Sequence, residues 1–176
     1  MRMCVKDRFR IIGAMSGTSL DGLDLALVDF FREKSGWKFE WIKAKTVTYP
    51  NSLQKALATG IDADEKVLKQ LDEELGSFIG QAIKSEFNEY EANIDFIASH
   101  GHTIHHRPAE AYTLQIGSGH RIFQSTGIPV INNFREADVL AGGQGAPLVP
   151  IGDRDLFGHY DYALNLGGIA NISYEK

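Results

Sequence analysis

The 176-residue sequence predicts an α/β fold in which a mixed sheet of about five strands is covered by helices on both faces. Three strand-like segments follow one another near the start of the chain, and strands alternate with helices over the remainder. The clearest helical pattern lies between these two regions. This order of elements is typical of a sheet flanked by helices.

The first two strands are predicted from apolar runs at residues 11–15 and 25–31, which are joined by a loop of glycine, hydroxyl and acidic residues. Residues 37–49 begin by alternating aromatic and charged side chains, which is typical of a strand with one solvent-exposed face. Ser35 and Gly36 supply the turn before this third strand. We therefore expect three antiparallel strands in succession.

Residues 64–91 carry apolar side chains at spacings of three and four, with Glu, Lys and Gln on the opposite side, which predicts a long amphipathic helix. Gly76 and Gly80 lie inside this pattern, so we expect the helix to pack closely against the sheet there. A shorter helix is predicted just before it, with Asn51 as its N-cap.

The second half of the chain alternates between short strands and helices. Strands are predicted at residues 95–99, 112–116 and 129–132, a helix closed by glycine at 118–127, helical material around a glycine-rich bend at 137–157, and two strands around Gly167 and Gly168 at 162–174.

Composition narrows the class of protein. The chain is 43% hydrophobic and 23% charged with a net charge of −5, which is typical of a globular protein and argues against nucleic acid or an anionic membrane as a partner. The single cysteine, Cys4, excludes an internal disulfide. The first ten residues carry four basic side chains but no apolar stretch typical of a secretory signal. We therefore expect a cytoplasmic protein.

The loop between the first two strands carries the chemistry of a phosphate site. Glycines let backbone amides approach a ligand, and the hydroxyls of Ser16, Thr18 and Ser19 can donate to phosphate oxygens. The carboxylates of Asp21 and Asp24 would repel phosphate unless Mg²⁺ stood between them. The loop therefore indicates a nucleotide site, and the alternative is an ordinary turn.

Four of the six histidines lie between residues 100 and 106, directly after the strand predicted at 95–99. His102 and His106 have the i, i+4 spacing of a helical zinc pair, and His100 and His102 would share one face of an extended chain. Histidines that merely end a strand are a second interpretation. A third is a ligand site, because ligands of open α/β sheets collect outside the carboxyl ends of strands.

Three motifs resemble those of the anhydro-N-acetylmuramic acid kinases, which belong to the superfamily of sugar kinases, actin and heat-shock ATPases. They are Met15-Ser16-Gly17-Thr18-Ser19-Leu20-Asp21-Gly22-Leu23-Asp24, the stretch from Asn133-Phe134-Arg135 to Pro150, and Leu164-Asn165-Leu166-Gly167-Gly168-Ile169-Ala170-Asn171-Ile172-Ser173. The resemblance implies a ribonuclease-H-like lobe over residues 1–160, followed at residues 161–176 by the first hairpin of a second lobe.

The resemblance also implies ligands and the residues that hold them. ATP phosphates would lie against Gly17, Thr18, Ser19, Leu20, Asp21, Gly22, Leu23, Asp24, Gly167, Gly168 and Asn171, with Mg²⁺ near Asp21. The anhydro-amino-sugar would contact His100, Thr103, Arg135, Asp138 and Gln144. Three positions depart from the family pattern: His102 replaces glutamine, Asn133 replaces aspartate, and Ala137 stands where a second arginine is common. The last departure leaves open whether the substrate carries the lactyl carboxylate.

The activity implied is ATP-dependent phosphorylation of the sugar at O6 with hydrolytic opening of its anhydro ring. The family's general base is an aspartate in a later motif, expected beyond Lys176, so no catalytic residue is assigned in this sequence. The second lobe, or a second copy of the chain, is the expected protein partner. Two other hypotheses stay open: an inactive lobe that binds a sugar or a protein, and a metal-dependent hydrolase built on the histidines.

Overall fold

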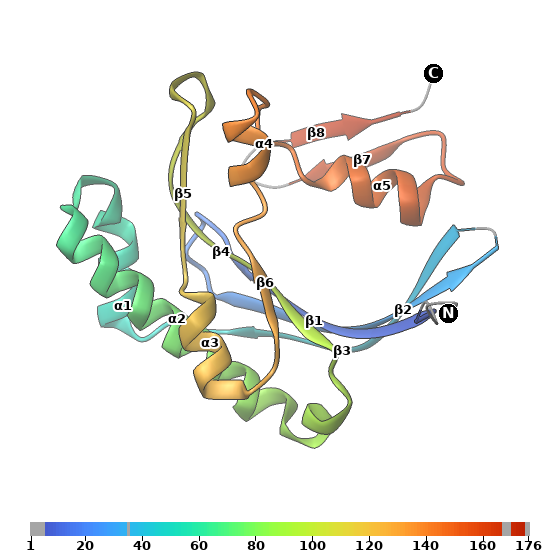
Figure 1. Cartoon of the computed structure of the whole chain (residues 1–176), viewed down its shortest axis with the longest axis horizontal. Helices are drawn as coiled ribbons and strands as arrows, with labels where there is room; N and C mark the ends of the chain where they lie inside the picture. Colours follow the sequence, from blue (N-terminus) through green and yellow to red (C-terminus); the bar gives the residue numbers. More distant parts are fainter. Residues whose placement is uncertain (1–5, 35, 167–169, 175–176) are drawn as a thin grey trace, which may run out of the picture.

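The computed structural model describes residues 6–34, 36–166 and 170–174 of the chain, and it is an α/β fold as predicted (Figure 1). The main sheet has six strands, one more than the number expected. Strands are β1 (Arg8–Ser16), β2 (Leu23–Glu33), β3 (Gly36–Val47), β4 (Phe96–Arg107), β5 (Tyr112–Ile116), β6 (Val130–Asn132), β7 (Ala163–Leu166) and β8 (Ala170–Ser173). Helices are α1 (Asn51–Thr59), α2 (Glu65–Phe87), α3 (Gly119–Thr126), α4 (Glu136–Leu140) and α5 (Val149–Phe157), with short 3₁₀ turns at Gly60–Asp62, Asn88–Asn93 and Pro108–Glu110.

The sheet has the strand order β3-β2-β1-β4-β5, and β6 pairs with β4 as well. The first three strands are antiparallel neighbours, as the sequence predicted, whereas β4 runs parallel to β1 and to β6. Strands β5 and β6 pair with different parts of β4, so they share its outer edge. This mixed topology is consistent with a ribonuclease-H-like lobe.

Helices α1, α2 and α3 cover one face of the sheet, and α5 lies over the other (Figure 1). The core between the sheet and α2 contains the largest fully buried side chains, among them Ile12, Leu75, Ile79 and Phe87. On the opposite face α5 contacts β3, where the rings of Phe39 and Phe157 meet edge to face with centroids 5.7 Å apart. The prediction of helices on both faces is therefore confirmed.

The ends and contacts of two helices differ in detail from the prediction. Asp64 caps α2 by accepting a hydrogen bond from the Val67 amide at 2.9 Å, but Asn51 is the first residue of α1 rather than its cap. Gly76 and Gly80 pack against α3 and the residue before it, not against the sheet. A Cβ atom at either glycine would lie 2.6 Å from an atom of Ser118 or Ser125. Tertiary contact with a later helix explains glycines that helix propensity disfavours.

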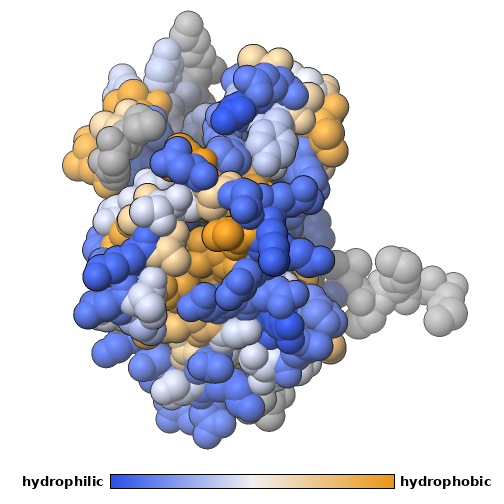
Figure 2. Space-filling view, turned by 90° about the vertical axis from the view of Figure 1, so that its left-hand side faces the viewer, coloured by the Kyte–Doolittle hydropathy of each residue, from blue (hydrophilic) through white to orange (hydrophobic). Residues whose placement is uncertain are grey.

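Strands β7 and β8 form a separate antiparallel pair, as the sequence predicted for residues 162–174, while Gly167 and Gly168 lie outside the described residues. Leu164, Leu166 and Ile172 of this pair are each more than half exposed. Seen from the side of α1, the molecule is mainly hydrophilic, with hydrophobic residues exposed through its middle (Figure 2). Within the described residues no helix is long and apolar enough to cross a membrane.

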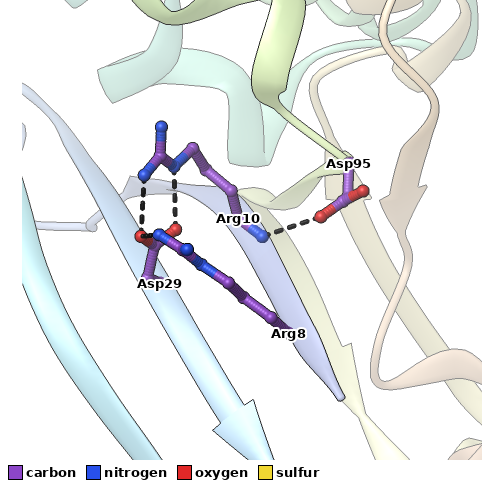
Figure 3. Close-up of polar contacts among 4 residues, drawn as sticks. All are labelled: Arg8, Arg10, Asp29 and Asp95. Atoms are coloured by element: carbon purple, nitrogen blue, oxygen red, sulfur yellow. Dashed lines mark hydrogen bonds and ion pairs between the residues drawn. The ribbon is translucent and has the colours of Figure 1, made fainter. Parts of the chain in front are cut away.

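An ion-pair cluster joins β1, β2 and the residue before β4 at the end where β1 begins (Figure 3). The Arg10 guanidinium donates two hydrogen bonds to the buried Asp29 carboxylate at 2.8 and 2.7 Å, and Arg8 donates a third at 2.6 Å. The hydrogen bond from Arg10 is the main reason that the pKa of Asp29 is lowered to about 2. Asp95 accepts from the Arg10 amide at 2.8 Å and pairs with Lys6. The cluster therefore ties three neighbouring segments together.

We expect Asp29→Asn to lower the free energy of unfolding by about 1.5–3 kcal/mol, because the two arginines lose a charged acceptor. The pKa of Asp29 is depressed in the folded state, so its stabilisation is complete above the ordinary value near 3.8 and is lost as the pH falls through about 2. Thermal unfolding of the wild type and the variant between pH 2 and 7 measures both effects. Exposed Asp62, changed to Asn, is the control. Equal stability of the two variants at pH 7 would contradict the assignment.

Candidate functional site

The loop at residues 17–22 leaves β1 at Ser16 and returns into β2 at Leu23. Thr18, Ser19 and Asp21 are exposed, and the Ser19 hydroxyl donates to the Asp21 carboxylate at 2.8 Å. Helix α1 contacts the loop through Gln54, whose side-chain amide donates a hydrogen bond to the Leu20 carbonyl at 2.7 Å. Exposed hydroxyls and a carboxylate on a braced loop can bind a phosphate together with a cation.

Two further loop predictions have different outcomes. Asp24 accepts a hydrogen bond from the Thr46 hydroxyl at 2.6 Å, so its carboxylate is tied to β3. Ser16 is buried and lies against His102 and Tyr49, so its hydroxyl is engaged inside the protein. The expectation that Ser16 donates to phosphate therefore conflicts with its position. The burial of Ser16 cannot be predicted from the sequence, because Ser16 lies only two residues before the exposed hydroxyl of Thr18 and has the same chemistry.

The histidine segment lies inside β4, which corrects the prediction of a strand that ends at Ser99. Strand β4 continues because its second half pairs with β5. A one-residue irregularity interrupts the pairing with β1: Ala14 pairs with Ser99, but Met15 pairs with Gly101 and Ser16 with His102. Such a bulge exchanges the faces of all later side chains. His100 and His102 therefore lie on opposite faces, and the expectation that they share one is wrong.

His100 faces Arg135, which precedes α4. Arg135 Nε donates to His100 Nε2 at 3.1 Å, and its Nη1 donates to the Gly145 carbonyl at 2.6 Å. Since His100 Nε2 accepts, its proton lies on Nδ1, which is 3.0 Å from the Gly101 carbonyl. Burial, with the Arg135 charge adding to it, lowers the pKa of His100, so the imidazole is neutral at pH 7. Burial also lowers the pKa of Arg135.

The glycine-rich bend is fastened to the same place. The Asp138 carboxylate accepts from the Gly145 amide at 2.6 Å, so Asp138 supports the bend. Gln144, next to Gly145, is exposed. The structure thus brings His100, Arg135 and the bend together. Among the described residues, the partners of the Arg135 guanidinium are neutral groups, the His100 ring and the Gly145 carbonyl.

The remaining positions that the sequence singled out are Thr103, Asn133, Ala137 and Asn171, and the structure gives each of them a different environment. Thr103 faces Gln115 of β5, whose amide lies 3.5 Å from its hydroxyl. Asn133 has a left-handed backbone, with φ of 60°, and its side chain donates to Glu136; Ala137 is exposed. Asn171 lies in β8, and its side-chain oxygen is buried with no hydrogen-bond partner among the described residues.

The four histidines of the segment do not converge on a common point. His106 Nδ1 lies 3.1 Å from the Thr113 hydroxyl, and the His105 ring packs against Tyr112 with centroids 5.8 Å apart. Across the described part of the chain, no three His, Cys, Asp or Glu side chains are arranged to hold a metal ion. The arrangement therefore gives no support to a hydrolase built on these histidines.

Comparison with known proteins identifies one family. The family model for anhydro-N-acetylmuramic acid kinase matches residues 9–175. A protein of that name from Acaryochloris marina (strain MBIC 11017) is 41% identical over 173 residues, which cover 93% of this chain and 46% of the relative. One from Crocosphaera subtropica (strain ATCC 51142 / BH68) is 40% identical over 173 residues, which cover 93% of this chain and 45% of the relative. One from Trichormus variabilis (strain ATCC 29413 / PCC 7937) is 38% identical over 180 residues, with 94% and 46% covered. The chain spans about half the length of the curated relatives it matches.

We expect Gly101→Ala to destabilise the protein more than Gly127→Ala does. The two glycines have the same left-handed backbone, with φ of 69° and 70°, which costs another residue about 1–2 kcal/mol. A Cβ atom at Gly101 would lie 2.2 Å from the Ile116 carbonyl oxygen, whereas one at Gly127 meets open space. The difference in free energy of unfolding, measured by urea titration, should be about 1–3 kcal/mol. Equal losses would contradict the tight bulge.

Proposed function

The chain belongs to the anhydro-N-acetylmuramic acid kinase family, and on that premise we propose that it forms the phosphate- and sugar-binding part of such a kinase. The reaction is ATP-dependent phosphorylation of 1,6-anhydro-N-acetylmuramic acid with hydrolytic opening of its anhydro ring, giving N-acetylmuramic acid 6-phosphate. The observation that supports the proposal is the pairing of Ser16 with His102, because the loop at residues 17–22 then begins next to the strand segment that carries His100, the partner of Arg135.

The loop at residues 17–22 fits the phosphates and Mg²⁺. Asp21 presents an exposed carboxylate, and Mg²⁺ is typically bound by one or two carboxylates together with phosphate oxygens and water. A Cβ atom at Gly22 would lie 2.6 Å from Thr46 Cγ2, so a larger residue at this position would require Thr46 to move. In this proposal Asp21 holds the cation, and Thr18 and Ser19 donate to phosphate oxygens. Gly167, Gly168 and Asn171 are assigned to the same phosphates by the resemblance of their motif alone.

The sugar side is built around Arg135. Its Nε and Nη1 are engaged with His100 and Gly145, and within the described residues its Nη2 has no acceptor. The N–H groups of Nη2 can donate to a ligand carboxylate, because guanidinium binds carboxylates through directional, charge-assisted hydrogen bonds. The hydroxyl of Thr103 and the amide of Gln144 add neutral hydrogen-bonding groups, and Asp138 keeps the bend in place. We therefore assign the lactyl carboxylate of the sugar to Arg135.

We further propose that β7 and β8 begin a second lobe, so that residues 1–160 and 161–176 belong to different lobes. The separate pairing of these strands and the exposure of Leu164 and Leu166 support the division. A general base would then come from the second lobe, and none is assigned in this chain. ATP and Mg²⁺ would lie between the lobes, in a cytoplasmic enzyme that serves cell-wall recycling.

A second candidate function is a sugar-binding lobe without catalysis. Position 137 supports it, because exposed Ala137 leaves Arg135 without a second guanidinium beside it. Release of ADP from Mg-ATP and the anhydro-sugar distinguishes the two functions once a second lobe is supplied. Binding of the sugar without any ADP release in that assay would favour the second candidate.

We expect the chain to bind Mg-ATP, and Asp21→Asn to weaken that binding about ten-fold, equivalent to about 1.4 kcal/mol. The reason is the loss of the carboxylate that holds the cation against the phosphates. Isothermal titration with and without Mg²⁺ measures the affinity, and Asp62→Asn is the control. Unchanged affinity in Asp21→Asn, or binding that ignores Mg²⁺, would contradict the assignment of this loop.

We expect Arg135→Lys to weaken binding of the anhydro-sugar at least ten-fold while Mg-ATP affinity changes less than two-fold. Lysine keeps the charge but lacks the planar set of donors that holds His100, Gly145 and a carboxylate together. Titration with 1,6-anhydro-N-acetylmuramic acid and with the corresponding sugar that lacks the lactyl group separates the contributions. If the variant loses affinity equally for both sugars, the carboxylate is bound elsewhere.

A further inference from the structure

Three buried polar side chains form a continuous hydrogen-bonded group, here called the buried triplet: Tyr49, Ser16 and His102. The Tyr49 hydroxyl donates to Ser16 Oγ at 2.7 Å, and Ser16 Oγ lies 3.0 Å from His102 Nδ1. The exposed fractions of the three residues are 4%, 1% and 4%. Buried polar groups are costly unless they satisfy one another, so the three side chains depend on a common geometry.

The order of donors follows from the contacts. Ser16 Oγ accepts from Tyr49, so its own hydrogen is available for His102 Nδ1. His102 then carries its proton on Nε2 and is neutral. Burial, which is the main cause of its lowered pKa, favours this form of the imidazole, and burial likewise raises the pKa of Tyr49 and keeps its hydroxyl protonated. Each member of the triplet therefore has one defined role.

The triplet lies where the two halves of the proposed site meet. Ser16 is the last residue of β1, directly before the phosphate loop, and it pairs in register with His102. His102 stands between His100 and Thr103 of the sugar side. Tyr49 comes just before α1, which braces the same loop through Gln54. Movement of Ser16 relative to His102 would thus displace the phosphate loop relative to the sugar-binding strand.

We propose that His102 is a positioning residue, which through Ser16 fixes the phosphate loop relative to the sugar-binding segment of β4. The inference rests on the proposed function and deepens it, because it assigns a role to a position where the chain departs from the pattern that its motifs resemble. His102 contacts neither ligand in this proposal. Its contribution is one acceptor atom, Nδ1. Because of the bulge before Gly101, the His102 side chain lies on the buried face of the sheet, toward the helices.

The test compares two substitutions that differ in that acceptor. His102→Gln keeps an acceptor oxygen within reach of Ser16, and His102→Leu keeps a similar volume without one. We expect His102→Leu to weaken Mg-ATP binding about ten-fold with less than a two-fold change in anhydro-sugar affinity, and His102→Gln to stay within about three-fold of the wild type for both ligands. Isothermal titration of the whole chain, with melting temperatures recorded for every variant, gives these values; His120→Leu, on the exposed surface of α3, is the control.

Loss of Mg-ATP affinity in both variants, or in neither, would overturn the proposal, because the acceptor atom would then not be decisive. If His102→Leu fails to fold, Ser16→Ala replaces it, because alanine removes the hydroxyl that donates to His102 Nδ1. A loss of about three-fold in Mg-ATP affinity then supports the proposal, and no loss overturns it. A wild-type chain that binds neither Mg-ATP nor the sugar contradicts the proposed function itself. A wild-type chain that binds both, with unaffected variants, contradicts only the role of His102.

Discussion

The parallel pairing of β1 with β4, and the one-residue bulge within it, decides how the candidate site is built. Before the bulge, Ile12 pairs with Ile97 and both face the helices; after it, Ser16 pairs with His102 on that same face. Without the extra residue, regular alternation would leave His100 and His102 together on the face that points away from the helices. The bulge thus buries His102 beside the loop at residues 17–22 and leaves His100 facing Arg135, so that two histidines two residues apart lie on opposite faces of the sheet.

The two ends of β1 are stabilised by different kinds of polar contact. Where β1 begins, Arg10 and Asp29 form a charged pair, which holds the strands through hydrogen bonds between full charges. Where β1 ends, the buried contacts of Ser16 are with neutral groups. Burying a charge is costly, and the buried groups beside the loop are neutral. The charged side chains of Asp21 and Arg135 lie nearer the surface, where a charged ligand could reach them. The sheet is therefore tied by ion pairs at one end and by neutral hydrogen bonds at the other end, beside the proposed site.

Most elements were predictable from local pattern, because periodicity and turn residues act within a few residues of one another. The long helix capped by Asp64, the strand Tyr112–Ile116 and the helix closed by Gly127 all follow from such signals. The length of β4 was not predictable, since its second half exists through pairing with β5. Likewise, Gly76 and Gly80 pointed to close packing, but only the fold identifies α3 as the neighbour.

The sequence by itself determined the class of fold, the family and the residue types available for the proposed contacts to phosphate, cation and sugar. Only the tertiary structure decided which of those residues meet: Arg135 contacts His100 across 35 positions of the chain, and Ser16 contacts His102 across 86. Tyr49 gave no signal of its role, because a tyrosine at the end of a strand is ordinary until its hydroxyl is seen to reach Ser16. The physical reason is that a hydrogen bond depends on distances of about 3 Å, and strand register, including a single bulge, sets them.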